Sequence, residues 1–169
     1  MDEVAVIVAV HFTLTNAADG TQVISAGRVN ALVLTIANAG TSAMTFKGGK
    51  AVPEDSAPSG PSAMYLSFLD LLGLHELTQL RIAAAPGWTA TLFTGPAPTW
   101  ALTPDRDTVL RPGESLAFVL DNVVPTRPKR SAPLIVDFHA MGVPSGSRSL
   151  ALEIGPARRG PHDVIQRRV

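Results

Sequence analysis

Two stretches of alternating large apolar residues, each ending in Asn, most constrain what this chain can fold into. They cover residues 32–38 and 116–122. Alternation with a period of two places every second side chain on the same face of a β-strand. The residues that share a face are Leu32, Leu34 and Ile36 in the first stretch and Leu116, Phe118 and Leu120 in the second. We interpret both stretches as central strands of a β-sandwich whose inward faces meet.

The composition supports an all-β fold. Hydrophobic residues make up 46% of the 169 residues and charged residues 17%, and Gly and Pro occur 14 times each. An average soluble domain has about 25% charged residues, and disorder needs low hydrophobicity and high charge. Frequent Gly and Pro between short β-branched runs are typical of many short strands joined by turns. Further strands are expected at residues 4–15, 21–24, 44–46, 64–68, 80–84, 88–92, 99–102, 134–139 and 149–154.

The segments between these strands are irregular. Residues 47–63 form a long loop rich in Pro and Gly, and residues 125–133 form a polar, basic loop. Leu71, Leu74 and Leu77 recur at helical spacing, which predicts one or two helical turns between the sheets. We therefore predict an antiparallel β-sandwich domain over residues 1–154 and an irregular basic tail over residues 155–169.

Two short motifs flank the patterned strands. Gly27 leads into a strand that ends in Asn38-Ala39-Gly40, and Leu110-Arg111-Pro112-Gly113-Glu114-Ser115 precedes the second stretch. With these motifs the chain resembles the bacterial immunoglobulin-like domains found as adhesion and surface-associated modules, over about a third of its length. The resemblance implies an immunoglobulin-like or related sandwich with a binding or scaffold role, and it implies no catalytic residues.

Candidate catalytic groups are few. Asp137 and His139 lie two residues apart on one face of a predicted strand, as a base and its orienting partner could. The simpler interpretation places Leu134, Val136 and Phe138 in the core and leaves this pair on an outer face. A hydrolase would require Asp137, His139 and a Ser to converge in a pocket. Ser115 lies in a Gly-x-Ser context, but a turn precedes it and a strand follows, which is the reverse of a nucleophile elbow.

Metal and cofactor sites are not predicted. The chain has no Cys, and its four His residues are scattered without ligand spacing. Asp105 and Asp107 offer two carboxylates in a turn, which is too few oxygens for a calcium site. We expect no catalytic residues, metal or cofactor, and the chain is predicted not to be an enzyme.

Aromatic side chains are candidate ligand contacts. Tyr65, Trp88 and Trp100 could stack against sugar rings on a sheet face, or could fill the core. Trp88 alternates with Ala90 and Leu92, which favours the core for Trp88. An exposed coplanar pair would favour a carbohydrate-binding module.

Basic side chains are candidate partner contacts. They lie in the loop, at Arg127, Lys129 and Arg130, and in the tail, at Arg158, Arg159, Arg167 and Arg168. The formal net charge is +0, and aromatic residues are not interleaved with these cations. This pattern argues against nucleic acid, and the tail arginines could contact an acidic partner surface or phosphates.

The N-terminal residues do not have the form of a secretory signal. Asp2 and Glu3 precede an apolar run, where a signal peptide would begin with basic residues. No stretch reaches the roughly 18 apolar residues of a membrane span, so membrane insertion is not expected. We predict synthesis and folding in the cytoplasm, with a place in a larger or exported assembly left open.

These observations favour a non-enzymatic structural or protein-interaction module that binds a protein partner or self-associates. A carbohydrate-binding module with exposed aromatic residues is the alternative, and a hydrolase is the second alternative.

Overall fold

The two patterned stretches form neighbouring strands of one sheet. The computed structural model describes residues 10–49, 64–68, 71–94 and 97–156 of the chain. Strand β3 (Asn30–Asn38) pairs antiparallel with β10 (Ser115–Val123), and Leu34 lies directly opposite Phe118. The prediction that their inward faces meet across the sandwich is wrong, because the two strands lie side by side. Alternation identifies the buried face of each strand and does not say whether two such strands share a sheet.

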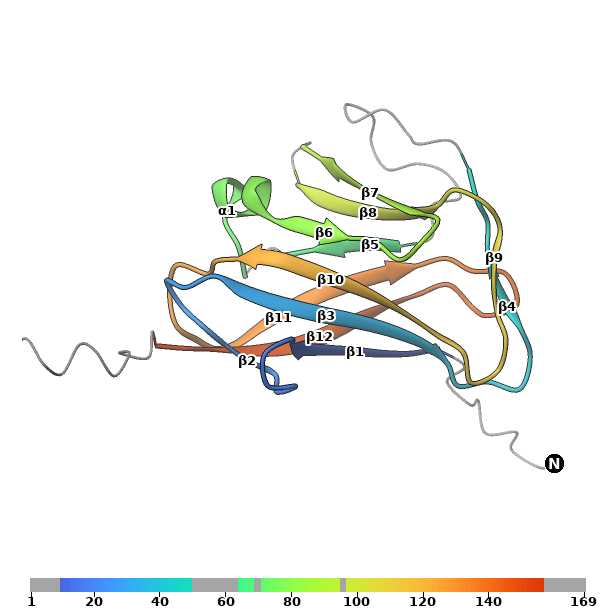
Figure 1. Ribbon diagram of the computed structural model, residues 1–169, viewed down its shortest axis with the longest axis horizontal. Helices are drawn as coiled ribbons and strands as arrows, with labels where there is room; N and C mark the ends of the chain where they lie inside the picture. Colours follow the sequence, from blue (N-terminus) through green and yellow to red (C-terminus); the bar gives the residue numbers. More distant parts are fainter. Residues whose placement is uncertain (1–9, 50–63, 69–70, 95–96, 157–169) are drawn as a thin grey trace, which may run out of the picture.

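Two larger sheets and one ribbon make up the fold (Figure 1). The four-stranded sheet has the order β1 (Val10–Asn16), β3, β10 and β6 (Arg81–Ala83). The six-stranded sheet has the order β2 (Val23–Ser25), β12 (Gly146–Gly155), β11 (Lys129–Phe138), β5 (Met64–Ser67), β8 (Thr99–Pro104) and β7 (Trp88–Phe93). All pairings are antiparallel except that of β2 with β12, which is parallel. The predicted all-β sandwich is confirmed.

The core lies between the two larger sheets. Leu32, Leu34 and Ile36 are fully buried on one side. On the other, β11 buries Leu134, Val136 and Phe138, which confirms the simpler of the two registers. The rings of Phe12 and Phe138 meet between the sheets with centroids 5.1 Å apart.

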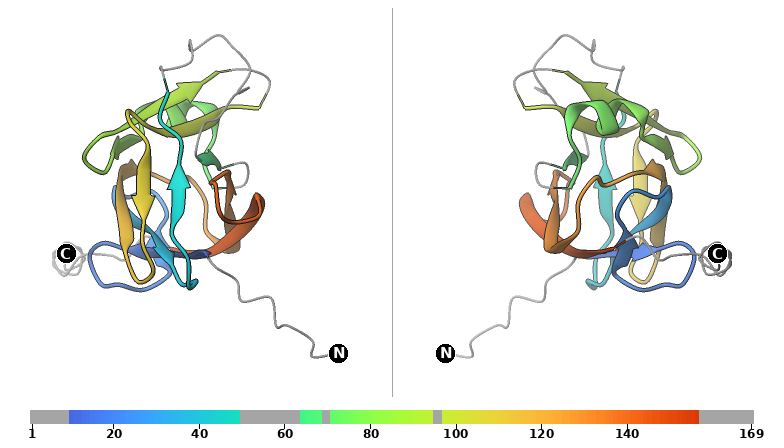
Figure 2. Two further views of the ribbon diagram at one scale, coloured as in Figure 1. Left: turned by 90° about the vertical axis from the view of Figure 1, so that its right-hand side faces the viewer. Right: turned by 90° about the vertical axis from the view of Figure 1, so that its left-hand side faces the viewer.

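The ribbon consists of β4 (Met44–Phe46) and β9 (Thr108–Leu110), which stand upright at one end of the sandwich (Figures 1 and 2). Trp88 packs edge-on between Phe46 of β4 and Phe118 of β10, with ring centroids 5.3 Å away in both cases. The same indole ring thus joins the ribbon to both larger sheets. The interpretation of Trp88 as a core residue is confirmed.

The predicted helical turns correspond to α1 (Leu74–Gln79). Leu77 is buried in the core, but Leu74 is 57% exposed. The helix begins only at Leu74, so Leu71 lies before it and the three leucines do not share one helical face. Within the described residues, no helix is long and apolar enough to cross a membrane.

The predicted basic loop is shorter than expected. Strand β11 already begins at Lys129, with a change of register between Lys129 and Ala132. Pro133 is tolerated in this strand because β5 pairs with β11 only from Ile135 onward. Strand β12, which pairs with β11, extends through Gly155, whose carbonyl accepts a hydrogen bond from the Ala26 N–H at 2.9 Å.

Parts of three predicted segments lie outside the described residues. These are residues 4–9 of the first strand, 50–63 of the long loop and 157–169 of the basic tail.

Candidate binding face at the end of the sandwich

A buried asparagine fixes the base of the ribbon. Asn38 is 1% exposed, and its side-chain Nδ2 donates hydrogen bonds to the carbonyls of Ser42 and Leu110, both at 2.8 Å. Its Oδ1 accepts a hydrogen bond from the Gly40 N–H at 2.9 Å. Ser42 precedes β4 and Leu110 ends β9, so one side chain holds both strands of the ribbon.

The residues around Met141 add a third strand-like segment to the ribbon. The Thr45 N–H donates to the Met141 carbonyl at 3.0 Å, and the Met141 N–H donates to the Thr45 carbonyl at 2.7 Å. Gly142 makes this approach possible, because a Cβ there would lie 2.9 Å from the Ala43 carbonyl oxygen. Its φ of +91° is also in the region that favours glycine.

The outer face of this small sheet carries two exposed apolar side chains. Thr45 lies directly opposite Val109 on one side and Met141 on the other. Residues directly opposite in antiparallel pairing share a face, so the three side chains form a row. Val109 is 51% exposed and Met141 is 56% exposed. We call the row of Val109, Thr45 and Met141, together with the hollow beside it, the ribbon face.

The hollow has a volume of about 200 Å³. The residues that line it are Thr45, Lys47, His139, Ala140, Met141 and Ser145. His139 Nδ1 lies 2.9 Å from Ser145 Oγ, within hydrogen-bond distance. The hollow therefore combines an ammonium, an imidazole and hydroxyl groups with the apolar side chain of Met141.

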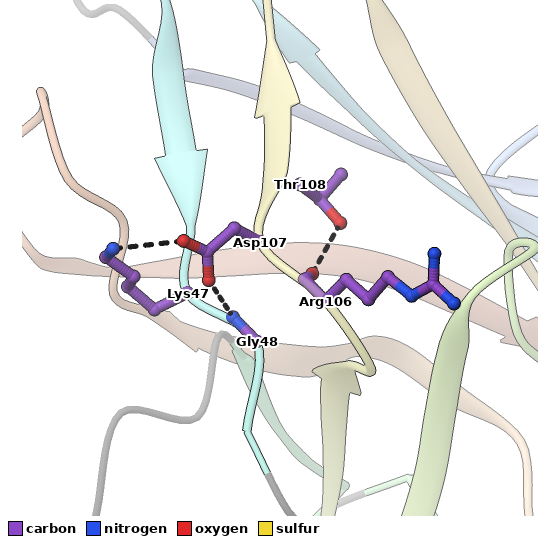
Figure 3. Close-up of polar contacts among 5 residues, drawn as sticks. All are labelled: Lys47, Gly48, Arg106, Asp107 and Thr108. Carbon is purple, nitrogen blue, oxygen red and sulfur yellow. Dashed lines mark hydrogen bonds and ion pairs between the residues drawn. The ribbon is translucent and has the colours of Figure 1, made fainter.

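An ion pair holds the far end of the ribbon. Lys47 Nζ donates to Asp107 Oδ2 at 3.0 Å, and the Gly48 N–H donates to Asp107 Oδ1 at 2.9 Å (Figure 3). The hydrogen bond from Lys47, and then that from Gly48, lower the pKa of Asp107 below its ordinary value of 3.8. Both side chains of the pair are about half exposed, so the pair positions Lys47 more than it stabilises the fold.

The three aromatic candidates do not form a common platform. Trp88 is buried in the core and is not available to a ligand. Trp100 lies opposite Leu66 and packs against the core, whereas Tyr65 lies opposite Ala101 on the other face of the sheet. These residues do not form the exposed coplanar pair that would favour a carbohydrate-binding module.

The basic candidates lie away from the ribbon face. Arg127, Lys129 and Arg130 are exposed at the start of β11, and His139 directly follows the end of that strand. A strand of ten residues spans about 30 Å, so these cations are at the opposite end of the sandwich. Arg158, Arg159, Arg167 and Arg168 lie outside the described residues, and all seven stay predicted partner contacts.

The predicted Asp137–His139 pair is only partly assembled into a site. His139 meets a serine, Ser145, but Asp137 lies opposite Tyr65 and Ser147. In the described part of the chain no hydrogen bond joins Asp137 to His139. Among the described residues, no group of three His, Cys, Asp or Glu is placed to hold a metal ion.

Most residues of the ribbon face gave no signal in the sequence. Thr45, Val109 and Met141 come from three separate segments, and two of these segments are strands of only three residues. Such strands are too short to show a reliable period. The exposed apolar side chains of Val109 and Met141 are unremarkable until the pairing with Thr45 brings them together.

Comparison with known proteins identifies the fold. No family model matches the chain, and no curated protein matches it. A solved structure of an uncharacterized protein from Nocardia farcinica, which has an immunoglobulin-like fold, covers 85% of this chain and 97% of its own, with a TM-score of 0.54 and 13% identity. The sporulation control protein Spo0M from Bacillus subtilis matches with a TM-score of 0.42 and 11% identity, over 88% of this chain and 50% of its own.

Proposed function

We propose that this immunoglobulin-like domain is a non-enzymatic protein-interaction module and that the ribbon face is its contact surface. The observation that carries the proposal is the row of Val109, Thr45 and Met141, with both apolar ends exposed, beside a polar hollow. Interface centres are typically apolar, with methionine enriched, and are surrounded by polar groups. The surface is also held in place, since Asn38 fixes one end of the ribbon and Asp107 the other.

Site-specific photo-crosslinking tests this proposal. A photoreactive amino acid is placed at Val109 or at Met141 of the full chain, in the cells from which the chain comes. The matched controls are Val29 and Leu74, which are 71% and 57% exposed and lie outside the ribbon face. We expect one discrete adduct from both ribbon-face positions and none from the controls. A doubled mass would identify self-association, and another mass a different partner. Equal adducts at all four positions, or none at any, would contradict the proposal.

A second candidate is a serine hydrolase, favoured by the 2.9 Å distance between His139 Nδ1 and Ser145 Oγ. A serine activated by a neighbouring base reacts with fluorophosphonate probes. Labelling that is lost in Ser145→Ala and kept in Ser42→Ala would favour the hydrolase. Under the interaction proposal, Ser145 stays unlabelled.

A further inference from the structure

The polar groups that line the hollow are suited to an anion. Lys47 contributes an ammonium, His139 an imidazole, and Thr45 and Ser145 hydroxyl groups. No acidic residue is among the described residues that line it. The nearby acids are Asp107, which is already paired with Lys47, and Asp137, which precedes His139 by two residues on β11.

Lys47 can donate to a ligand, and so can His139 in one of its two tautomers. A lysine ammonium has three N–H groups, and one of those on Lys47 is used by Asp107. His139 uses Nδ1 toward Ser145. When the Ser145 hydroxyl donates to Nδ1, the imidazole hydrogen lies on Nε2, and the ring becomes a donor on its other side.

The backbone favours a side-chain carboxylate over the C-terminus of a peptide. Terminal carboxylates are usually captured by clustered backbone N–H groups. Here the N–H groups of Thr45 and Met141 donate to each other's carbonyls and are not available. These two residues of the hollow therefore offer no backbone donor to a ligand.

We propose that the hollow binds an Asp or Glu side chain of the partner, with apolar partner residues covering Met141 and Val109. This inference rests on the proposed function, because it assigns the chemistry of the partner that contacts the ribbon face. One carboxylate oxygen accepts from Lys47 and the other from His139. The apolar side chains of Met141 and Val109 exclude water from this contact and strengthen it.

A pair of peptides tests the proposal on the full-length chain. The probes are acetyl-Leu-Asp-Leu-amide and its neutral counterpart acetyl-Leu-Asn-Leu-amide. The ring nitrogens of His139 are followed by NMR and assigned with the His139→Gln variant. We expect a saturable shift with the Asp peptide at millimolar concentration and binding of the Asn peptide that is weaker by about tenfold, because a hydrogen bond to a charged group is worth more than a neutral one.

Matched lysine variants complete the test. Lys47→Gln should weaken binding of the Asp peptide about tenfold, because it removes a charged donor and leaves the Asp107 carboxylate unpaired beside the hollow. Lys129→Gln, at the other end of β11, should leave binding unchanged. Equal binding of the two peptides, no shift with either peptide, or unchanged binding in Lys47→Gln would overturn the inference.

The two proposals fail separately. Crosslinking at Val109 without binding of the Asp peptide would keep the interaction module and remove the acidic partner. Binding of the Asp peptide without any crosslink would keep the carboxylate site and remove the proposed function.

Discussion

Asn38 Nδ2 lies 2.8 Å from the carbonyl oxygen of Leu110, although the two residues are 72 positions apart in the sequence. Around this contact the Asn38 N–H donates to the Glu114 carbonyl at 2.9 Å, and the Gly113 N–H donates to the Asn38 carbonyl at 2.8 Å. The two motifs on which the immunoglobulin-like resemblance rests therefore form one hydrogen-bonded corner. The corner supports the ribbon on which the proposed contact surface lies.

Replacing Asn38 with Ala should destabilise the domain. The change leaves the Leu110 carbonyl without its donor at a buried site and the Ser42 carbonyl without its donor at a half-buried one, at a cost of about 2–4 kcal/mol. Asn16→Ala is the matched control, because Asn16 makes two side-chain hydrogen bonds, against three for Asn38, and both are exposed at the end of β1. Urea denaturation measures both. A loss in Asn38→Ala no larger than that in Asn16→Ala would contradict the structural role of the corner.

Gly142→Ala should loosen the ribbon face. The new Cβ would lie 2.9 Å from the Ala43 carbonyl oxygen, and the positive φ at position 142 adds a backbone cost. Gly20→Ala, with a φ of +71° and open space around it, carries only the backbone cost of about 1 kcal/mol. Hydrogen exchange of the Thr45 and Met141 amides should accelerate in Gly142→Ala and not in Gly20→Ala. Equal protection in both variants would show that the close approach is not required.

Stability should depend on Asp107 in acid. Its folded-state pKa is lowered, so its contribution is present above the unfolded pKa and is lost as pH falls through the folded value. Asp107→Asn should be less stable than the wild type at pH 7, and the difference should shrink as the pH falls below 3.8. Thermal melts of both proteins between neutral and acidic pH measure this difference. A difference in stability between the two proteins that does not change with pH would argue that the ion pair does not stabilise the domain.

Tyr65→Phe should leave the domain equally stable or stabilise it. The Tyr65 hydroxyl is buried and has no hydrogen-bond partner among the described residues. Removing an unsatisfied buried hydroxyl recovers about 1 kcal/mol, which raises Tm by about 2–4 °C in a domain of this size. Calorimetry measures the shift. A clear fall in Tm would show that the hydroxyl has a partner.

Trp88→Ala should cost about 3–5 kcal/mol, because it empties the space between Phe46 and Phe118. Trp100→Ala should cost less, since Trp100 is only half-buried. Chemical denaturation of the two variants, followed by circular dichroism, compares them directly. The reverse order would mean that Trp100 contributes more to the core than Trp88 does.

The long strands could be predicted from the sequence because nine or ten residues are enough to show alternation. This applies to β3, β10 and β11, whose buried faces were identified correctly. The partnership of β3 with β10 could not be predicted, since alternation is the same for strands that share a sheet and strands that face each other. Which strands pair depends on how the loops connect them, and the whole chain determines this.

The candidate site was largely beyond the sequence. His139 stood out as a titratable group, but Ser145 was not marked as its partner. The sequence predicts only a loop at Lys47, whose position is set by Asp107, 60 positions away. The ribbon face forms by pairing between short segments that are far apart in the sequence, so no local sequence pattern predicts it.

Because of the way β4 packs, the fluorescence of Trp88 can report on the ribbon face. Phe46 follows Thr45 on the opposite side of the strand, and its ring meets the indole of Trp88. A partner that contacts Thr45 therefore lies next to Phe46, which packs against the fluorescent indole of Trp88. The partner does not contact Trp88 itself. We expect the emission of Trp88 to change when the face is occupied, so binding could be followed without any label on either molecule.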